Sequence, residues 1–293
     1  MNTEQKYKNL QEIIRSLQKV VVAFSGGVDS TFLLKVCVDV LGRGNVLAFI
    51  GQSPTCPERE LEEAKSLAAL IGTDYLIRET TEMEDQNFIQ NDRSRCYFCK
   101  SHLFRKAWEI AHEKEYLHVV EGSNLDDMDD FRPGRKACTE QNIRSPLLEA
   151  RLTKGEIREL SRALSLPTHD KPAFACLSSR IPYGVAIDVQ ALKKIERAED
   201  FLQEIGIRQV RVRNHGVVAR IEVMPEDFEK VIANRERVSK TLQAYGFSYV
   251  TIDLKGYRMG SMSGHMGTFL LGNSDEMTGS LMTAKQKVSG KGK

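Results

Sequence analysis

The sequence predicts an α/β fold in which a doubly wound, mainly parallel sheet is followed by a smaller C-terminal α+β domain. Strand-like apolar runs alternate with helical patterns over the first half of the chain, as they do in such sheets. The first run, residues 20–24, is apolar throughout, which indicates a parallel strand buried on both faces. The 293 residues are enough to form two cores. We expect domains over residues 1–170 and 171–262 and a disordered tail over 263–293.

The elements of the first domain follow one another in a regular order. A helix is expected over residues 30–41, directly after the first strand and its loop. Thr153 and Glu156 have the spacing of a capping box, which predicts a helix from there to residue 164. The other predicted elements are strands over 46–50, 75–77 and 117–121 and helices over 58–71 and 98–114.

The second domain is predicted to be a compact α+β unit. Asp188 begins a helix that ends near residue 205, and Pro225 opens another helix at its first turn. The predicted strands are 209–213, 218–223 and 249–254, with a turn at 214–216 that joins the first two.

A phosphate-binding loop is predicted directly after the first strand. Gly26 and Gly27 let the backbone turn sharply and approach an anion, and the first N–H groups of the following helix face the loop. No Lys follows the glycines and no Gly-x-Gly-x-x-Gly is present, so the Walker and dinucleotide patterns are both absent. A tight turn with a hydroxyl cap is the alternative, but it explains only two of the six residues. The loop residues are Ser25, Gly26, Gly27, Val28, Asp29 and Ser30.

This loop resembles the pyrophosphate loop (PP-loop) of the ATP pyrophosphatase superfamily. The resemblance implies that the protein splits ATP into AMP and pyrophosphate and adenylylates an oxygen of its substrate. Ligands of doubly wound sheets lie beyond the carboxyl ends of the strands. We therefore expect the loop to meet Ser53, after the second strand, and Gly122, Asn124 and Asp127, after a later one. A solvated acidic turn is the alternative for residues 122–127.

Charge and hydropathy favour a small anionic substrate and a cytoplasmic protein. Lys and Arg total 42 against 40 Asp and Glu, a formal charge of +2, so no overall basic field argues for a long nucleic-acid footprint. The chain contains no run of 18 apolar residues and no apolar signal core near its start. We expect a homo-oligomer with no membrane partner.

Cys96 and Cys99 form the most informative cysteine pair. Disulfides are rare in the cytosol, so the six cysteines are expected to be thiols, ligands or catalysts. The Cys-x-x-Cys spacing falls near a predicted helix start, and basic neighbours such as Lys100 would favour the thiolate forms. The pattern indicates metal or redox use, although a structural zinc site generally needs four ligands.

Cys176 is the third cysteine of interest. Two hydroxyl residues and Arg180 follow it closely, a neighbourhood that suits an anionic ligand. A buried thiol beside Phe174 and Leu177 is the alternative. The remaining cysteines are Cys37, which fits a helix core, and Cys56 and Cys138, to which the sequence gives no role.

Several segments together resemble the LarE family. Its members are ATP-dependent sulfurtransferases that act on pyridinium-3,5-biscarboxylic acid mononucleotide during synthesis of the nickel-pincer cofactor. The resemblance covers roughly residues 5–262 and leaves the tail outside. The segments that carry it are the glycine loop at 25–30 and residues 122–127, 144–147, 176–180, 211–215 and 220–223.

The resemblance leaves two sources of sulfur open. In the single-cysteine type, the residue matched here by Cys176 gives up its own sulfur and becomes dehydroalanine. This chain also has Cys96 and Cys99, and so resembles members in which three cysteines hold a 4Fe-4S cluster with one iron free. A free iron can hold an extra sulfide, so the partner would be sulfide or another sulfur donor, and Cys176 would be a cluster ligand.

The resemblance also implies roles in the ATP, Mg²⁺ and substrate sites. Transfer of AMP makes a carboxylate oxygen a good leaving group, and a hydrosulfide or the Cys176 thiolate then attacks the acyl adenylate. Asp29 is the expected partner of the Mg²⁺ that bridges the phosphates. For Arg211 and Arg213, the alternative to substrate binding is that both lie on an exposed, charged face of a strand. The candidate substrate residues are Arg144, Ser179, Arg180, Arg211 and Arg213, with Glu222 as a metal ligand or an arginine partner.

Three other functions are compatible with parts of the sequence. A tRNA-thiolating enzyme would join the same ATP loop to cysteine-held iron and sulfur, but it needs an RNA-binding surface, and the near-neutral charge argues against one. A glutamine-dependent synthetase would need ammonia delivery and no paired cysteines. A non-catalytic nucleotide sensor would not need Cys96, Cys99 and Cys176.

Overall fold

The computed structural model describes residues 1–128, 133–172, 175–258 and 261. The chain divides into two units, Met1–Arg258 and Met259–Lys293. Both sheets described here belong to the first unit. The predicted disordered tail lies outside the described residues, and the domain boundary near residue 170 stays a prediction.

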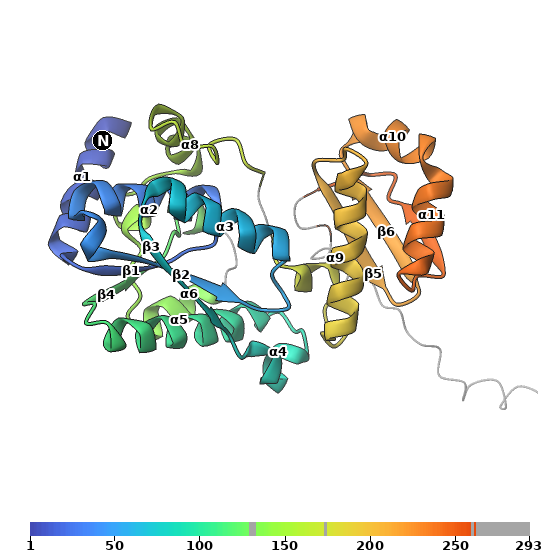
Figure 1. Cartoon of the computed structure of the whole chain (residues 1–293), viewed down its shortest axis with the longest axis horizontal. Coiled ribbons are helices and arrows are strands. Elements are labelled where there is room, and N and C mark those ends of the chain that lie inside the picture. The colour runs from blue at the N-terminus through green and yellow to red at the C-terminus, as the bar shows by residue number, and fades with distance from the viewer. Residues whose placement is uncertain (129–132, 173–174, 259–260, 262–293) are drawn as a thin grey trace, which may run out of the picture. The chain divides into compact units, whose positions relative to one another are not determined.

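A four-stranded parallel sheet confirms the predicted α/β class (Figure 1). Its strands are β1 (Val20–Ala23), β2 (Val46–Gln52), β3 (Asp74–Glu79) and β4 (His118–Val120). They lie in the order β3-β2-β1-β4. In the middle of the sheet, Val20 of β1 aligns with Val46 of β2 and with His118 of β4. The glycine loop therefore leaves a central strand.

Helices cover both faces of this sheet, as expected of a doubly wound fold (Figure 1). The helices in this part of the chain are α1 (Thr3–Leu17), α2 (Val28–Leu41), α3 (Glu58–Ile71), α4 (Gln86–Ile89), α5 (Arg95–Glu113), α6 (Gly134–Glu140), α7 (Pro146–Glu149) and α8 (Lys154–Ala163). Successive side chains of a strand point to opposite faces. Val20 and Val22 therefore pack in one core with α1, α2 and α3, and Val21 packs in another with α5 and α6.

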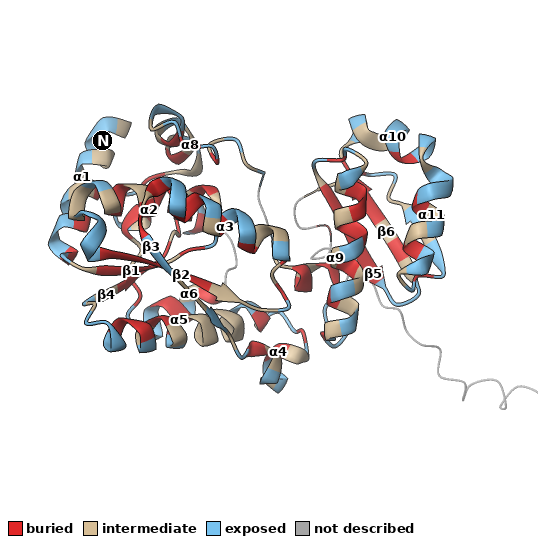
Figure 2. Ribbon diagram, in the orientation of Figure 1, coloured by how far each residue is buried: buried red, intermediate tan, exposed pale blue. Residues whose placement is uncertain are grey.

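A three-stranded mixed sheet confirms the predicted C-terminal α+β arrangement. It contains β5 (Val210–His215), β6 (Val218–Val223) and β7 (Tyr249–Ile252), and it packs with α9 (Val189–Glu204), α10 (Phe228–Ala233) and α11 (Arg235–Ala244). β6 runs antiparallel to β5 and parallel to β7. Figure 2 shows β5 and β6 largely buried and the outer sides of the helices exposed. Short 3-10 helices are η1 (Arg43–Asn45), η2 (Glu82–Glu84), η3 (Leu125–Met128), η4 (Leu177–Arg180) and η5 (Pro225–Asp227).

Two helices begin earlier than predicted. α2 starts at Val28 and not at residue 30, because Gly27 in extended conformation is its N-cap. α5 starts at Arg95 and not at residue 98. Cys96 and Cys99 consequently both lie near its first turn, which agrees with the expected position of the pair at a helix start.

The hairpin of the second sheet also differs from the prediction. β5 continues through His215, and the turn falls at Gly216, whose φ of +68° favours glycine. The third strand ends at Ile252, two residues early, and Pro225 opens the 3-10 turn η5 ahead of α10. The capping box of α8 is confirmed. Within the described residues, no helix has the length and apolar character needed to cross a membrane.

Candidate active site

The glycine loop turns β1 into α2 at the carboxyl edge of the parallel sheet. Gly26 has a φ of +68°, a conformation that favours glycine, and a Cβ there would make a tight contact, 3.2 Å from Ala64. Gly27 has no side chain that could occupy the first N–H groups of α2. The hydroxyl groups of Ser25 and Ser30 lie 3.1 Å apart across the loop. These donors are arranged to bind an anion.

Asp29 combines an ion pair with a buried oxygen. Lys154 Nζ donates to Asp29 Oδ2 over 2.6 Å, whereas Oδ1 is buried without a hydrogen-bond partner among the described residues. Burial raises the pKa of Asp29, and the nearby charge of Asp127 adds to this rise against the opposing effects of Lys154 and Asn124. A cation would offset the two neighbouring carboxylates, so their oxygen donors fit the predicted Mg²⁺.

The segment after β4 meets the glycine loop, as predicted. A Cβ on Gly122 would lie 3.0 Å from the backbone nitrogen of Ser30, so the chain approaches the first turn of α2 closely enough to favour glycine. Asn124 and Asp127 follow in the same turn, where the Asn124 N–H donates to Asp127 Oδ2 over 3.0 Å. Ser53 makes a different contact, because its hydroxyl donates to Glu82 of η2.

Residues 175–179 are called the Cys176 loop below. Two hydrogen bonds join this loop to the segment after β2 and to the start of α5. Cys176 is the N-cap of η4, and the N–H of the next residue, Leu177, donates to the carbonyl oxygen of Thr55 over 2.8 Å. Arg95 Nη1, from the first turn of α5, donates to the carbonyl oxygen of Ser178 over 3.1 Å. The Cys176 loop is thus tied to the helix that carries the Cys-x-x-Cys pair.

The three predicted cysteine ligands act on one another electrostatically. Loss of solvation raises the pKa of both Cys96 and Cys99, and Cys176 raises it further at each. Cys96 as a whole residue is exposed, but its thiol is poorly solvated, and this raises the thiol pKa. As predicted, basic neighbours favour the thiolates: Arg95 and Lys100 lower the pKa of Cys96, and Lys100 lowers that of Cys99. Loss of solvation outweighs them, so the pKa of both thiols is raised in the free protein.

Cys96, Cys99 and Cys176 are free thiols, the type of donor that holds iron–sulfur clusters. In the part of the chain that the structure describes, no three His, Cys, Asp or Glu side chains are arranged to hold a metal ion. A 4Fe-4S cluster holds its cysteines farther apart than a single ion does, and it binds them as thiolates. Iron would offset the repulsion among three neighbouring thiolates. The donor set therefore fits a cluster by its chemistry.

Cys56, for which no role was predicted, lies beside Cys176. The hydrogen bond from Leu177 brings the two segments together. Burial, followed by the charge of Glu60 and then by Cys176, raises the pKa of Cys56 to about 12. Cys56 also lines a hollow of about 340 Å³ at the end of β2. Its thiol stays protonated at neutral pH and is a weak nucleophile.

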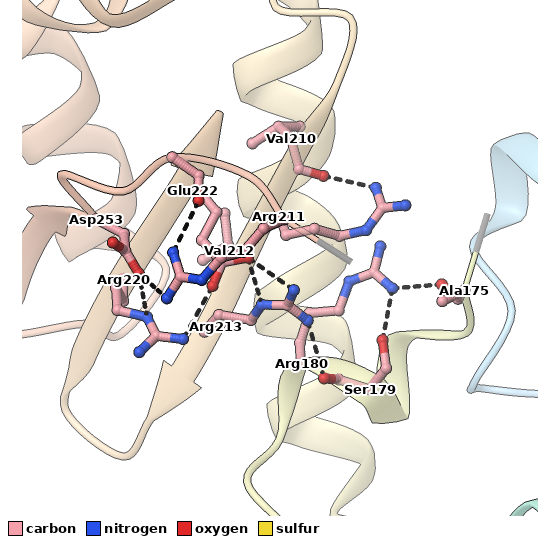
Figure 3. Close-up of polar contacts among 12 residues, drawn as sticks. Ala175, Ser179, Arg180, Val210, Arg211, Val212, Arg213, Arg220, Glu222 and Asp253 are labelled. Atoms are coloured by element: carbon pink, nitrogen blue, oxygen red, sulfur yellow. Dashed lines mark hydrogen bonds and ion pairs between the residues drawn. The ribbon is translucent and has the colours of Figure 1, made fainter. Parts of the chain in front are cut away.

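Arg180 binds the backbone of the Cys176 loop through its buried guanidinium (Figure 3). Its guanidinium is fully buried and makes a two-point ion pair with Glu199 of α9, with both bonds at 2.9 Å. Nη1 donates to the carbonyl oxygens of Ala175 and Cys176. Burial alone would raise the pKa of Glu199, but Arg180 lowers it. These contacts indicate that Arg180 positions the loop, and its direct contact with substrate stays a prediction.

Arg213 and Glu222 form a second buried pair on β5 and β6 (Figure 3). Arg213 Nη2 donates to Glu222 Oε2 over 2.7 Å, and Arg220 Nη2 donates to Oε1 over 2.9 Å. Of its two predicted roles, Glu222 thus has that of an arginine partner. Arg213 Nη1 donates to the carbonyl oxygen of Ser179 over 3.0 Å. Arg211 and Arg213 are only 5% and 6% exposed, which excludes the exposed charged face.

Arg211 borders a hollow lined by both basic and acidic groups, in which Lys171 is paired with Glu60 and Glu63. The Arg211 guanidinium lies over the ring of Tyr257, 5.4 Å from the centroid, and its Nη1 donates to the carbonyl oxygen of Val210 over 2.7 Å. Burial, followed by the charge of Arg180, lowers the pKa of Arg211 to about 10, so it remains a cation at neutral pH. The hollow has a volume of about 470 Å³, and its lining includes Arg59, Glu60, Glu63, Lys171, Arg208 and Arg211.

Arg144 and Ser179 lie on different elements. The backbone of Arg144 pairs with Val120 at the end of β4, and its exposed side chain binds Glu149, with Nε 2.8 Å from Oε1. Ser179 lies in η4, where its hydroxyl accepts a hydrogen bond from Arg180 Nη1 over 3.0 Å. Substrate binding by either side chain stays a prediction.

Three residues of the site were not predicted. Lys154, the partner of Asp29, directly follows the N-cap of a correctly predicted helix, and that position was the only available signal. Glu199 and Glu82 gave no signal, because their partners lie 19 and 29 positions away in the chain.

Known proteins match most of the chain. The NAD synthase family matches residues 4–103. An uncharacterized protein of Synechocystis sp. is 42% identical over 89% of this chain and 97% of its own length. The pyridinium-3,5-bisthiocarboxylic acid mononucleotide synthase of Lactiplantibacillus plantarum is 36% identical over 88% of this chain and 94% of its own. An NH₃-dependent NAD⁺ synthetase of Methanocaldococcus jannaschii is 36% identical over 54% of this chain and 63% of its own. The chain therefore belongs to the LarE family.

Proposed function

We propose that this protein is an ATP-dependent sulfurtransferase that converts a carboxylate of pyridinium-3,5-biscarboxylic acid mononucleotide into a thiocarboxylate for the nickel-pincer cofactor. The relative from Lactiplantibacillus plantarum is named for a thiocarboxylate product of this kind. The observation that carries the proposal is the 2.8 Å hydrogen bond from Leu177 to Thr55. It ties the Cys176 loop to the end of β2, and β2 is the neighbour of the strand that leads into the glycine loop.

The glycine loop and its neighbours would activate the substrate. The N–H groups of α2 would bind the phosphates of ATP, and Asp29, with Asp127 nearby, would hold Mg²⁺. The ion offsets the negative charge that accumulates during attack at the α-phosphate. AMP then moves to the substrate carboxylate while pyrophosphate leaves, and the carboxylate oxygen becomes part of a good leaving group.

The hollow beside Arg211 would bind the anionic substrate. A pyridinium mononucleotide carries a phosphate and two carboxylates, and guanidinium groups bind such anions through paired hydrogen bonds. Arg211 is buried, charged and partly desolvated, so an anion would relieve the cost of its burial. Arg213 would support this site through the carbonyl of Ser179, which fixes the Cys176 loop beside it.

The sulfur would enter at the cysteine site. Cys96, Cys99 and Cys176 would hold a 4Fe-4S cluster, which supplies an iron without a fourth cysteine ligand and can carry sulfur from outside the protein. Attack of a sulfur nucleophile on the acyl carbon forms the new carbon–sulfur bond and expels AMP. Sacrifice of the Cys176 sulfur is the alternative for the same step.

An anaerobic assay with ATP, the pyridinium mononucleotide and sulfide tests this function. The expected products are AMP, pyrophosphate and a thiocarboxylate, formed in equal amounts. ADP and phosphate as the nucleotide products would contradict the proposal. Thiolation of tRNA in the absence of any reaction with the mononucleotide would instead favour the tRNA-thiolating alternative.

A further inference from the structure

Glu82 has a buried carboxylate oxygen that the fold leaves without a partner. The residue lies in η2 and is 1% exposed. The hydroxyls of Ser53 and Thr55 both bind Oε1, the second over 3.4 Å. Oε2 is buried and has no hydrogen-bond partner among the described residues. A buried oxygen without a hydrogen bond costs free energy because its hydration is lost and not replaced, and such atoms are rare in native proteins.

This carboxylate adjoins the Cys176 loop. The Thr55 hydroxyl donates to Glu82, and the carbonyl oxygen of the same Thr55 accepts the N–H of Leu177, the residue after Cys176. One residue therefore links Glu82 to the third predicted cysteine ligand. The hydroxyl of Ser53 fixes the carboxylate from the side of β2.

Glu82 also adjoins the Cys-x-x-Cys helix. α5 packs against η2, and Met83 joins Phe98, Cys99 and Leu177 in one apolar cluster. Two independent sets of contacts thus place Glu82 beside the predicted cluster ligands.

We propose that Glu82 supplies a non-thiol ligand, through Oε2, to the iron that Cys96, Cys99 and Cys176 leave open. The inference rests on the cluster of the proposed function. A carboxylate oxygen is a harder donor than a thiolate and binds the iron of a sulfur cluster less firmly. The open position would therefore be occupied at rest and remain exchangeable for an incoming sulfur. Coordination to iron would also give Oε2 a partner, which it lacks among the described residues.

Spectroscopy of reconstituted protein tests the inference without an activity assay. Wild-type protein, Glu82→Gln and Glu84→Gln would be reconstituted anaerobically with ⁵⁷Fe and sulfide. Glu84 is the matched control, because it lies in the same 3-10 helix but is exposed. About four irons per chain are expected in all three proteins. The Mössbauer signal of one iron in four should shift in Glu82→Gln and stay unchanged in Glu84→Gln.

A measurement on the wild type keeps the test valid if Glu82→Gln fails to fold. Protein labelled with ¹³C at the glutamate side-chain carboxyl carbon should show coupling of a ¹³C nucleus to the reduced cluster in pulsed electron paramagnetic resonance. Loss of this coupling in Glu82→Gln would confirm the assignment. A wild-type cluster without the coupling, or an unshifted iron signal in folded Glu82→Gln, overturns the role of Glu82 alone. Wild-type protein that assembles no cluster overturns the cluster and the inference together.

Discussion

Arg95 Nη1 donates a hydrogen bond to the carbonyl oxygen of Ser178, 3.1 Å away and 83 positions later in the chain. The same nitrogen binds the Oδ1 of Asn91, and the guanidinium lies over the ring of Tyr183, 4.7 Å from its centroid. Asn91 in turn donates to the carbonyl oxygens of Pro182 and Val185, at 2.8 Å each. This network fixes the segment around Cys176 against the start of the Cys-x-x-Cys helix.

Removal of this guanidinium should affect both stability and sulfur transfer. Arg95→Ala loses buried hydrogen bonds from a charged donor, so we expect the free energy of unfolding to fall by about 1.5–3 kcal/mol. Sulfur transfer should fall further than stability alone explains, because the Cys176 loop would no longer be held against α5. Urea unfolding and a single-turnover assay measure the two effects, with the exposed Arg93→Ala as the control. Unchanged transfer in folded Arg95→Ala would refute the docking role.

Asp29→Ala should abolish the release of AMP and pyrophosphate and leave the fold intact. The carboxylate is the expected Mg²⁺ ligand, and its loss also frees Lys154 from its ion pair. Chromatography of the nucleotide products, together with circular dichroism, measures both outcomes. Asp39→Ala is the matched control, because Asp39 lies on the same helix but is exposed. Normal pyrophosphate release by Asp29→Ala would rule out its role in ATP activation.

Arg211→Ala should weaken binding of the pyridinium mononucleotide. Loss of a hydrogen bond to a charged group costs about 1.5–3 kcal/mol, or roughly 10- to 150-fold in the dissociation constant. Calorimetric titration measures this loss, and Arg235→Ala, an exposed arginine of α11, should bind normally. Total RNA should not compete for the site. Tight and strongly salt-dependent binding of tRNA would contradict the small-substrate assignment.

The raised thiol pKa of Cys56 predicts a loss of stability in alkali. The unfolded chain releases this proton near pH 9, whereas the folded chain keeps it to about pH 12. The folded state therefore binds more protons in this window, and the free energy of unfolding falls as the pH rises through it. Urea unfolding of the iron-free protein between pH 7 and about pH 11 measures the slope. Cys56→Ser should lessen the slope, and an identical slope would show that this thiol ionises normally.

Local sequence patterns predicted the elements whose apolar side chains repeat at the spacing that the core requires. Residues 58–71 were predicted as a helix and form α3, because their apolar side chains repeat at helical spacing and face the core. The start of α5 was missed, since Ser94 makes no side-chain cap to mark it. The glycine loop was recognisable because its six residues are contiguous.

The parts of the site that depend on distant pairs could not be predicted. Arg180 was expected to bind substrate, but the fold pairs it with Glu199 and with the backbone of the loop that precedes it. Glu82 carried no local signal at all, because its partners Ser53 and Thr55 lie 29 and 27 positions away in the chain. Sequence spacing identifies which side chains have useful chemistry, whereas long-range pairing decides which of them remain available to a ligand.

The source of the transferred sulfur distinguishes a cluster on Cys96, Cys99 and Cys176 from sacrifice of the Cys176 sulfur. Reconstituted protein would be incubated anaerobically with ATP, the pyridinium mononucleotide and ³⁴S-labelled sulfide, and both product and protein would be weighed by mass spectrometry. If Cys96, Cys99 and Cys176 hold a cluster, the thiocarboxylate should carry ³⁴S, the chain mass should not change, and several turnovers should follow. A product with unlabelled sulfur, together with a chain lighter by one H₂S and dehydroalanine at position 176, would contradict this account.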